Sequence, residues 1–557
     1  MFLGEVSVNT LAIRSRKNPM IRKLLIPFFL LVLVFEMFAE EGKGQFTAVF
    51  APYNIEWNPH HAFTATEAQV FTAIYEGLVS FHPATLRPVP GAAESWELSE
   101  NNRRITFNLR ENIVWSNGER LVASDFKESW LAILSSESKA EYASLFDDIA
   151  GAREYRSGIG LREDVGIEVP DEKTLVVNLK QPSPQFLSLL CHYSFAPIHR
   201  DFRKLRDWSA IRSVPVNGPF VITARSENEV LLDKNPLYWD VKSLKTNRLR
   251  LVFSDDVNRI MRDFNRFEID WATSGIDTAQ LAIPEALSIT PQFSTTYYYF
   301  SNNSKVWNDA RIRRALTFLL PLDELREEQM IPGVSLVPPI PNYPAAESNF
   351  PPPEKRVEEA MKLLEEAGFP EGRGIPRIII RVPYSDSVAE AMKDTWKGTL
   401  GLDVIIEEVG FPDYYSSVRE GGYDLATLTW IGDYADPQTF LGMWDSQSSF
   451  NESGFSDHSY DALLREAATL PFLERFEKLQ EAESLLLSSC QVIPIEHYPA
   501  VNLIDRRFVD GWFPNALDIH PFKNLNSRLG FDIPGVARAE IGAGEIPSIG
   551  IYEEINL

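Results

Sequence analysis

The second half of the chain alternates between strand-type and helix-type patterns. Apolar runs at 377–382, 402–409 and 423–430 predict three strands, and the segments 385–399 and 413–419 between them predict helices. Strands joined through helices form a parallel sheet with right-handed crossovers, so this part is expected to be α/β. Ligands bind such sheets beyond the carboxyl ends of the strands.

The first half mixes strands and helices without a long repeat. Alternating residues predict strands at 105–110 and 174–179, and Val70, Ile74 and Leu78 recur at the spacing of one helix face. A chain of 557 residues is too long for one hydrophobic core, so two or three lobes are expected.

The segment 423–441, YDLATLTWIGDYADPQTFL, passes from a predicted strand into an acidic turn. Asp433 follows the strand directly and stands near Trp430, an arrangement that suits a small cationic group. The alternative is that Asp433 caps the turn, where Asp and Gly are common, and that Trp430 belongs to the core. The parallel sheet places Asp433 at the ligand-binding edge, and both interpretations stay open on the residues alone.

Charge and cysteine content exclude some classes of protein. The formal charge of −24 disfavours nucleic acid, which needs a positive surface. Only Cys191 and Cys490 are present, both in apolar surroundings typical of buried free thiols.

The N-terminal region predicts export. Residues 20–39 contain a basic pair, an apolar run too short to span a membrane, and a small residue, Ala39, after which cleavage is expected. Met20 is a second candidate for the start of the chain. No cysteine follows the apolar run, so a lipoprotein anchor is not expected.

No motif for catalysis or for a metal is present. The chain lacks H-E-x-x-H, G-x-S-x-G, a P-loop, and G-x-G-x-x-G after a strand, and its histidines form no convergent set. Binding is therefore favoured over catalysis, and no cofactor is expected. A secreted hydrolase with catalytic residues from distant segments stays an alternative, as does a surface adhesin.

Several long motifs, in order, resemble the extracytoplasmic solute-binding proteins of oligopeptide and dipeptide ABC transporters (family 5). The resemblance runs from about residue 46 to 525 and is carried by residues 74–126 (IYEGLVSF to VASDF), VNGPFVI, LLDKNPLYWD, FSNNSKVWNDARIRRALTFLL, WIGDYADPQTFL and GWFPNALDIHPFKNL.

This resemblance implies a two-lobe periplasmic-binding-protein fold (type II) with an extra inserted domain, closing on its ligand about a hinge. The implied division is a signal peptide at 1–39, domain I at 46–81, 206–291 and 503–525, domain II at 82–205, domain III at 292–502, and a tail at 526–557.

The resemblance also assigns site residues. Asp433 takes the position that pairs with the α-amino group of a peptide, Trp430 the position that lines a side-chain pocket, and Phe411 the position of a second tryptophan. Backbone groups are expected to pair with the ligand as an added strand. They belong to Thr429 and Ile431, and on the facing segment to Phe63, Thr64 and Ala65.

One position departs from the family pattern. Thr427 stands where some oligopeptide binders carry an arginine, and Arg419 is nearby but offset. The group that receives the carboxylate of the ligand is therefore open.

The function implied is the periplasmic binding component of a peptide ABC transporter. It would be a monomer that captures short peptides and delivers them to the permease in the inner membrane. Other solutes bound by relatives, such as a nickel chelate, haem or a sugar, stay alternatives.

Overall fold

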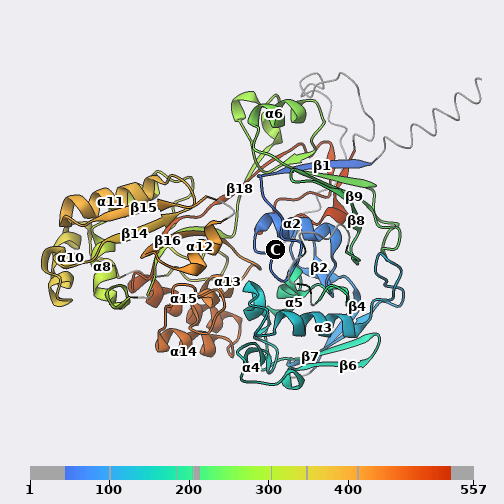
Figure 1. Cartoon of the computed structure of the whole chain (residues 1–557), viewed down its shortest axis with the longest axis horizontal. Helices are drawn as coiled ribbons and strands as arrows, with labels where there is room; N and C mark the ends of the chain where they lie inside the picture. Colours follow the sequence, from blue (N-terminus) through green and yellow to red (C-terminus); the bar gives the residue numbers. More distant parts are fainter. Residues whose placement is uncertain are drawn as a thin grey trace, which may run out of the picture.

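The computed structural model describes residues 44–528 except 100–101, 184, 204, 206–207, 209–213, 303, 347–348 and 411–412. The predicted signal peptide and residues 529–557 lie outside the described residues. Figure 1 shows two masses of helices and strands, with β18 (Pro499–Ile504) between them.

A seven-stranded mixed sheet forms the centre of the first mass. Its strands, in spatial order, are β12 (Leu287–Pro291), β18, β11 (Trp271–Ala272), β1 (Gln45–Phe50), β10 (Arg248–Phe253), β9 (Glu229–Lys234) and β8 (Phe220–Arg225). β1 is buried on both faces. Val49 packs with Met261 of α6 (Val257–Asn265), whereas Phe46 and Phe50 belong to the main core.

The predicted helix near residue 70 is α2 (Ala65–Ile74), which lies in the first mass (Figure 1). Its end differs from the prediction, because Tyr75 adopts an extended conformation with φ −120° and ψ 149°. Leu78 therefore lies outside the helix, where its carbonyl accepts hydrogen bonds from the amides of Gly91 and Ala93. The helix therefore ends at Ile74, because the residues after it pair with a neighbouring segment, although the apolar pattern continues to Leu78.

A four-stranded antiparallel sheet in the same mass confirms the two strands predicted in the first half. Its order is β4 (Ala93–Leu98), β5 (Arg104–Leu109), β7 (Thr174–Asn178) and β6 (Ile167–Asp171). The helix α3 (Ala123–Ile133) packs against β6 and β7, and Trp130 on it is fully buried, donating from Nε1 to the carbonyl of Phe195 at 2.9 Å.

The second mass is built on a five-stranded sheet. Its order is β15 (Val404–Glu408), β14 (Ile378–Val382), β16 (Leu425–Ile431), β13 (Ser294–Phe300) and β17 (Val492–Glu496). The first three strands are parallel and are connected through α11 (Ser387–Leu400) and α12 (Tyr414–Glu420), which confirms the predicted parallel unit. β13 pairs antiparallel with both β16 and β17, so β17 runs in the same direction as the first three strands. Neither β13 nor β17 was predicted. The domain boundaries stay a prediction.

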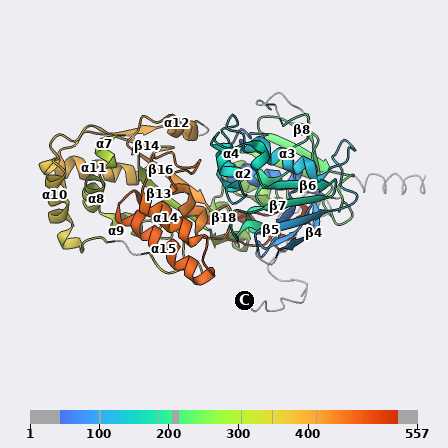
Figure 2. The same cartoon turned by 90° about the horizontal axis from the view of Figure 1, so that it is seen from below.

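Two packed helices, α14 (His458–Ala467) and α15 (Phe472–Ser488), lie side by side in the second mass (Figure 2). Arg475 of α15 holds the loop that follows β16 by a two-pronged ion pair with Asp436, at 2.7 and 2.8 Å. The Arg475 side chain is 3% exposed and that of Asp436 13%. This pair fixes the loop that carries Asp433.

We expect Arg475→Ala to lower the free energy of unfolding by about 3–5 kcal/mol, because Asp436 would keep its charge without a partner. Urea unfolding measures this change. Lys478→Ala is the control. Lys478, on the same helix, pairs with Glu481 on the surface, so its loss should change the stability by less than about 1 kcal/mol. Equal effects of the two substitutions would contradict the structural role of Arg475.

Candidate functional site

A cavity of about 510 Å³ is lined by residues of both masses. They come from α2 and the chain before it, from β16 and the turn after it, and from segments around residues 192, 500 and 520. The cavity brings together most of the predicted site residues, namely Phe63, Thr64, Ala65, Thr429, Trp430, Ile431 and Asp433.

β16 has a free backbone edge beside this cavity. Its pairing with β14 ends at Ala426, and the hydroxyl of Tyr414 engages the backbone N–H and C=O of Thr427. Gly432 donates its N–H to Phe293, on the β13 side. Because backbone groups alternate in direction along a strand, those of Thr429 and Ile431 point to the other edge, where no described strand pairs with them.

The facing segment is held by the N-terminal cap of α2. Thr64 caps the helix, and the buried carboxylate of Glu67 accepts hydrogen bonds from the amides of Phe63 and Thr64, both at 2.8 Å. Glu67 also accepts from the amide of Glu56 at 2.8 Å. The N–H groups of Phe63 and Thr64 are thus occupied, so pairing with a ligand strand falls to the remaining backbone groups of this segment.

Asp433 is a buried carboxylate without a cationic partner among the described residues. Its side chain is 7% exposed and accepts a hydrogen bond from the hydroxyl of Thr439 at 3.4 Å, and Nε2 of His192 lies 3.7 Å from Oδ1. Burial raises the pKa of Asp433 to about 7 and lowers the pKa of His192 to about 3, which leaves the imidazole neutral. A buried carboxylate of this kind favours a cationic group placed against it.

The turn-cap interpretation fits Asp436 better than Asp433. Oδ1 of Asp436 accepts from the amide of Gln438 at 2.9 Å, at the start of α13 (Gln438–Leu441). Trp430 is 4% exposed and donates from Nε1 to the carbonyl of Thr439 at 3.1 Å, so it belongs to the core and lines the cavity as well.

Aromatic rings that the sequence analysis did not identify complete the wall of the cavity. The ring centroid of Phe63 lies 5.1 Å from that of Tyr415, 5.8 Å from Tyr142 and 6.1 Å from Trp430. The ring centroid of Tyr142 in turn lies 4.4 Å from that of His192, with the two rings tilted by 51°. Neither Tyr142 nor His192 stands in a motif of recognised function, and only the fold brings them to Asp433.

The remaining predicted residues lie elsewhere. Thr427 and Arg419 line a smaller chamber of about 40 Å³. The hydroxyl of Thr427 donates to the carbonyl of Tyr297 at 3.2 Å, and Arg419 forms ion pairs with Glu141 and Glu452. Both are therefore already engaged. Phe411 lies outside the described residues.

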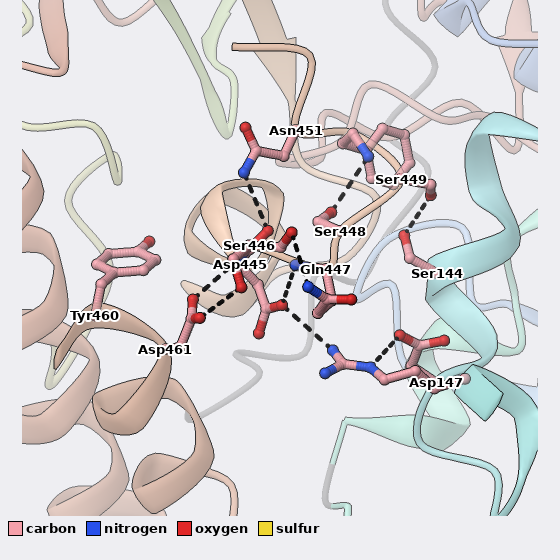
Figure 3. A network of polar contacts seen from close by, with 12 residues as sticks. Ser144, Asp147, Asp445, Ser446, Gln447, Ser448, Ser449, Asn451, Tyr460 and Asp461 are labelled. Carbon is pink, nitrogen blue, oxygen red and sulfur yellow. Dashed lines mark hydrogen bonds and ion pairs between the residues drawn. The ribbon is translucent and has the colours of Figure 1, made fainter. Parts of the chain in front are cut away.

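Polar contacts connect the two masses through the loop 445–451 (Figure 3). In the first mass, Arg153 and Arg156 both bind Asp147, and each also reaches the loop 445–451 of the second mass. Arg153 lies 3.5 Å from Asp445, and Arg156 donates to the carbonyl of Gln447 at 2.8 Å. At the same contact between the two masses, the hydroxyl of Ser449 donates to the carbonyl of Glu141 and lies 2.8 Å from the hydroxyl of Ser144.

The described residues contain no group of three or more His, Cys, Asp or Glu side chains suited to a metal ion. In the same part of the chain, no helix has the length and apolar character needed to cross a membrane.

Asp433→Asn should stabilise the ligand-free protein near pH 8. Burial raises the pKa of Asp433 from 3.8 to about 7, so the native state retains a proton that the unfolded state loses between these values, and stability falls as the pH rises through this window. The full penalty above pH 7 is about 4 kcal/mol, which asparagine avoids. Below about pH 4 both proteins should be equally stable.

Thermal unfolding midpoints of the two proteins, measured after removal of any bound ligand by unfolding and refolding, test this prediction. Asp436→Asn is the matched control, and it should destabilise at pH 8 because Asp436 is paired with Arg475. A stabilisation by Asp433→Asn that is the same at both pH values would be inconsistent with an ionised buried carboxylate.

Arg156→Ala should loosen the contact between the two masses, because it removes the bond to Gln447 and frees Asp147 from one of its two partners. Hydrogen exchange of the backbone amides in 445–451 should accelerate severalfold. Arg162→Ala is the control, since Arg162 pairs with Glu128 on the surface, away from this loop. Unchanged exchange in Arg156→Ala would exclude this network as a restraint on the loop.

Comparison with known proteins places the chain in a family. Residues 87–452 match the family described as bacterial extracellular solute-binding proteins, family 5 (middle). The chain is 28% identical over 496 residues to the oligopeptide-binding protein OppA of Bacillus subtilis, an alignment that covers 84% of this chain and 90% of that protein. It is 27% identical to the probable deoxycholate-binding periplasmic protein YgiS of Escherichia coli, with 82% and 88% covered.

A solved structure shows the same fold. The crystal structure of Haemophilus influenzae OppA in complex with the peptide RPPGFSPFR superposes with a TM-score of 0.78 at 26% identity, covering 87% of this chain and 99% of that one. The α/β periplasmic-binding-protein fold and the resemblance found in the sequence are thereby confirmed, and the family is one of binding proteins rather than enzymes. The chain belongs to the family 5 bacterial extracellular solute-binding proteins.

Proposed function

We propose that the protein is the extracytoplasmic binding component of a peptide ABC transporter, which captures short peptides between its two lobes and delivers them to a membrane permease. The observation that carries this proposal is that a buried carboxylate without a cationic partner and an unpaired strand edge lie at the same cavity. Asp433 suits the α-amino group of a peptide, and the backbone groups of Thr429 and Ile431 suit its main chain.

The charges around the cavity support a ligand with a cationic end. Three carboxylates line it, those of Glu76, Asp433 and Asp518, and burial keeps His192 neutral. Lys523 lines it too, but its ammonium group lies 2.8 Å from Glu76 and is already paired. The wall is therefore net negative and favours an ammonium over a carboxylate at the Asp433 end.

Main-chain pairing explains how one cavity would accept many sequences. Hydrogen bonds between backbone groups do not depend on the identity of the side chains, which would lie alternately on the two sides of the added strand. The two lobes would close about a hinge, and a ligand that contacts both of them would favour the closed state.

Isothermal titration with short peptides tests the proposal. A tripeptide with a free amine should bind, and its N-acetylated form should bind at least about 100-fold more weakly, because Asp433 would stay buried without a cation. Asp433→Asn should remove the difference between the two peptides. The control is Asp394→Asn, an exposed carboxylate on α11, which should preserve it.

Absence of heat with any peptide, together with no peptide in native mass spectra of the purified protein, would refute the proposal. A bile acid, suggested by the relative YgiS, is the second candidate. It carries no amine, so its binding should be insensitive to Asp433→Asn, and the net negative wall disfavours its carboxylate.

A further inference from the structure

A second, smaller chamber adjoins the main cavity. Its volume is about 40 Å³, and the two spaces share three lining residues, Phe63, Tyr415 and Leu428. A ligand paired along the free edge of β16 would pass Leu428, so one of its side chains can enter the chamber there. The entry of a ligand side chain into the chamber rests on the proposed function.

Two charged side chains line this chamber, and a third lies beside them. Arg419 and Glu452 line it, and Arg419 is ion-paired with Glu141, whose side chain is 12% exposed. The Nε of Arg419 lies 3.6 Å from Oε1 of Glu452. Two carboxylates thus share one guanidinium, which is itself 41% exposed.

The sharing leaves negative charge incompletely neutralised. The pKa of Glu452 is raised to about 7, mainly by burial and also by the charge of Glu141, and Arg419 offsets only part of this effect. Glu452 lines the chamber together with Tyr415, and its charge helps to raise the pKa values of Tyr415 and Tyr423.

Polar atoms in and beside the chamber lack partners. Oε2 of Glu141 and Nε1 of Trp444 are buried and have no hydrogen-bond partner among the described residues, and Trp444, which lines the chamber, is 4% exposed. Each such atom is costly to bury unsatisfied. A cationic group entering the chamber could donate to Oε2 of Glu141, whereas Nε1 of Trp444 is itself a donor and would be satisfied only by an acceptor.

The walls suit a long side chain with a cationic tip. They are largely aromatic, formed by Tyr297, Tyr299, Tyr414, Tyr415, Trp444 and Phe450. Aromatic faces attract cations and pack well against methylene stems. An apolar side chain would further desolvate the two carboxylates, and an acidic one would be repelled by them.

We propose that this chamber is a specificity subsite for a basic side chain of the bound peptide, with Glu452 and Glu141 receiving its cationic tip. Arg419 orients the two carboxylates and keeps them close together when the chamber is empty. The inference deepens the proposed function, because it names the class of peptide that this protein prefers.

Titration with matched peptides tests the subsite. The set consists of trialanine variants carrying lysine, acetyl-lysine, norleucine or glutamate at one position at a time. At one position, the lysine peptide should bind at least about 10-fold more tightly than the norleucine and acetyl-lysine peptides, and the glutamate peptide should bind most weakly. The difference should persist at raised salt, because a partly buried pair is screened less than a surface pair.

Glu452→Gln should reduce the advantage of the lysine peptide to within about threefold of the norleucine peptide, chiefly by weakening the binding of the lysine peptide. Glu163→Gln makes the same change of charge at an exposed position outside the chamber, and it should leave the advantage intact. Loss of the advantage in both variants would assign it to the net charge of the protein and overturn the subsite.

The two proposals fail separately. If peptides bind but lysine, acetyl-lysine and norleucine are equivalent at every position, the subsite is refuted and the peptide-binding function stands. If no peptide binds, the proposed function itself is refuted. The comparison of lysine with acetyl-lysine uses only the unaltered protein, so it decides the question even if Glu452→Gln does not fold.

Discussion

A carboxylate held out of water at the end of β16 is the constraint on which the site depends. Asp433 is buried, its nearest basic neighbour is a neutral imidazole, and hydrogen bonding from Thr439 compensates only partly for lost hydration. Such a group weakens the empty protein and strengthens the complex with a cation. The rest of the second lobe keeps it there, since Arg475 fixes the loop through Asp436.

The same strand supplies the second requirement, a backbone edge without a partner. β14 leaves β16 after Ala426, and Tyr414 engages the backbone of Thr427. The backbone groups of Thr429 and Ile431 on that edge therefore face the cavity with no described strand beside them. Across the cavity, Glu67 fixes the segment before α2 by taking up its amides. One side of the cavity thus offers strand pairing, and the other offers a rigid wall.

Contacts between the lobes combine aromatic packing with shared charges. Phe63 of the first lobe packs against Tyr415 and Trp430 of the second, and Arg153 and Arg156 connect Asp147 to the loop 445–451. Ion pairs that are partly exposed break more readily than a hydrophobic core, so this seam is suited to opening. The chamber behind Phe63 lies along this seam, where contributions from both lobes are needed to form it.

Local patterns in the sequence determined the parallel unit, the position of Asp433 after a strand, and the segments that resemble the family. Strand alternation, helix periodicity and motif order are readable within short windows of sequence. Tertiary structure alone decided the pairing of β13 with β17, the contact between the rings of Tyr142 and His192, and the shared charges of Glu141, Arg419 and Glu452. Glu141 and Arg419 are 278 residues apart in the chain, and no local periodicity records a contact that forms only when two lobes meet.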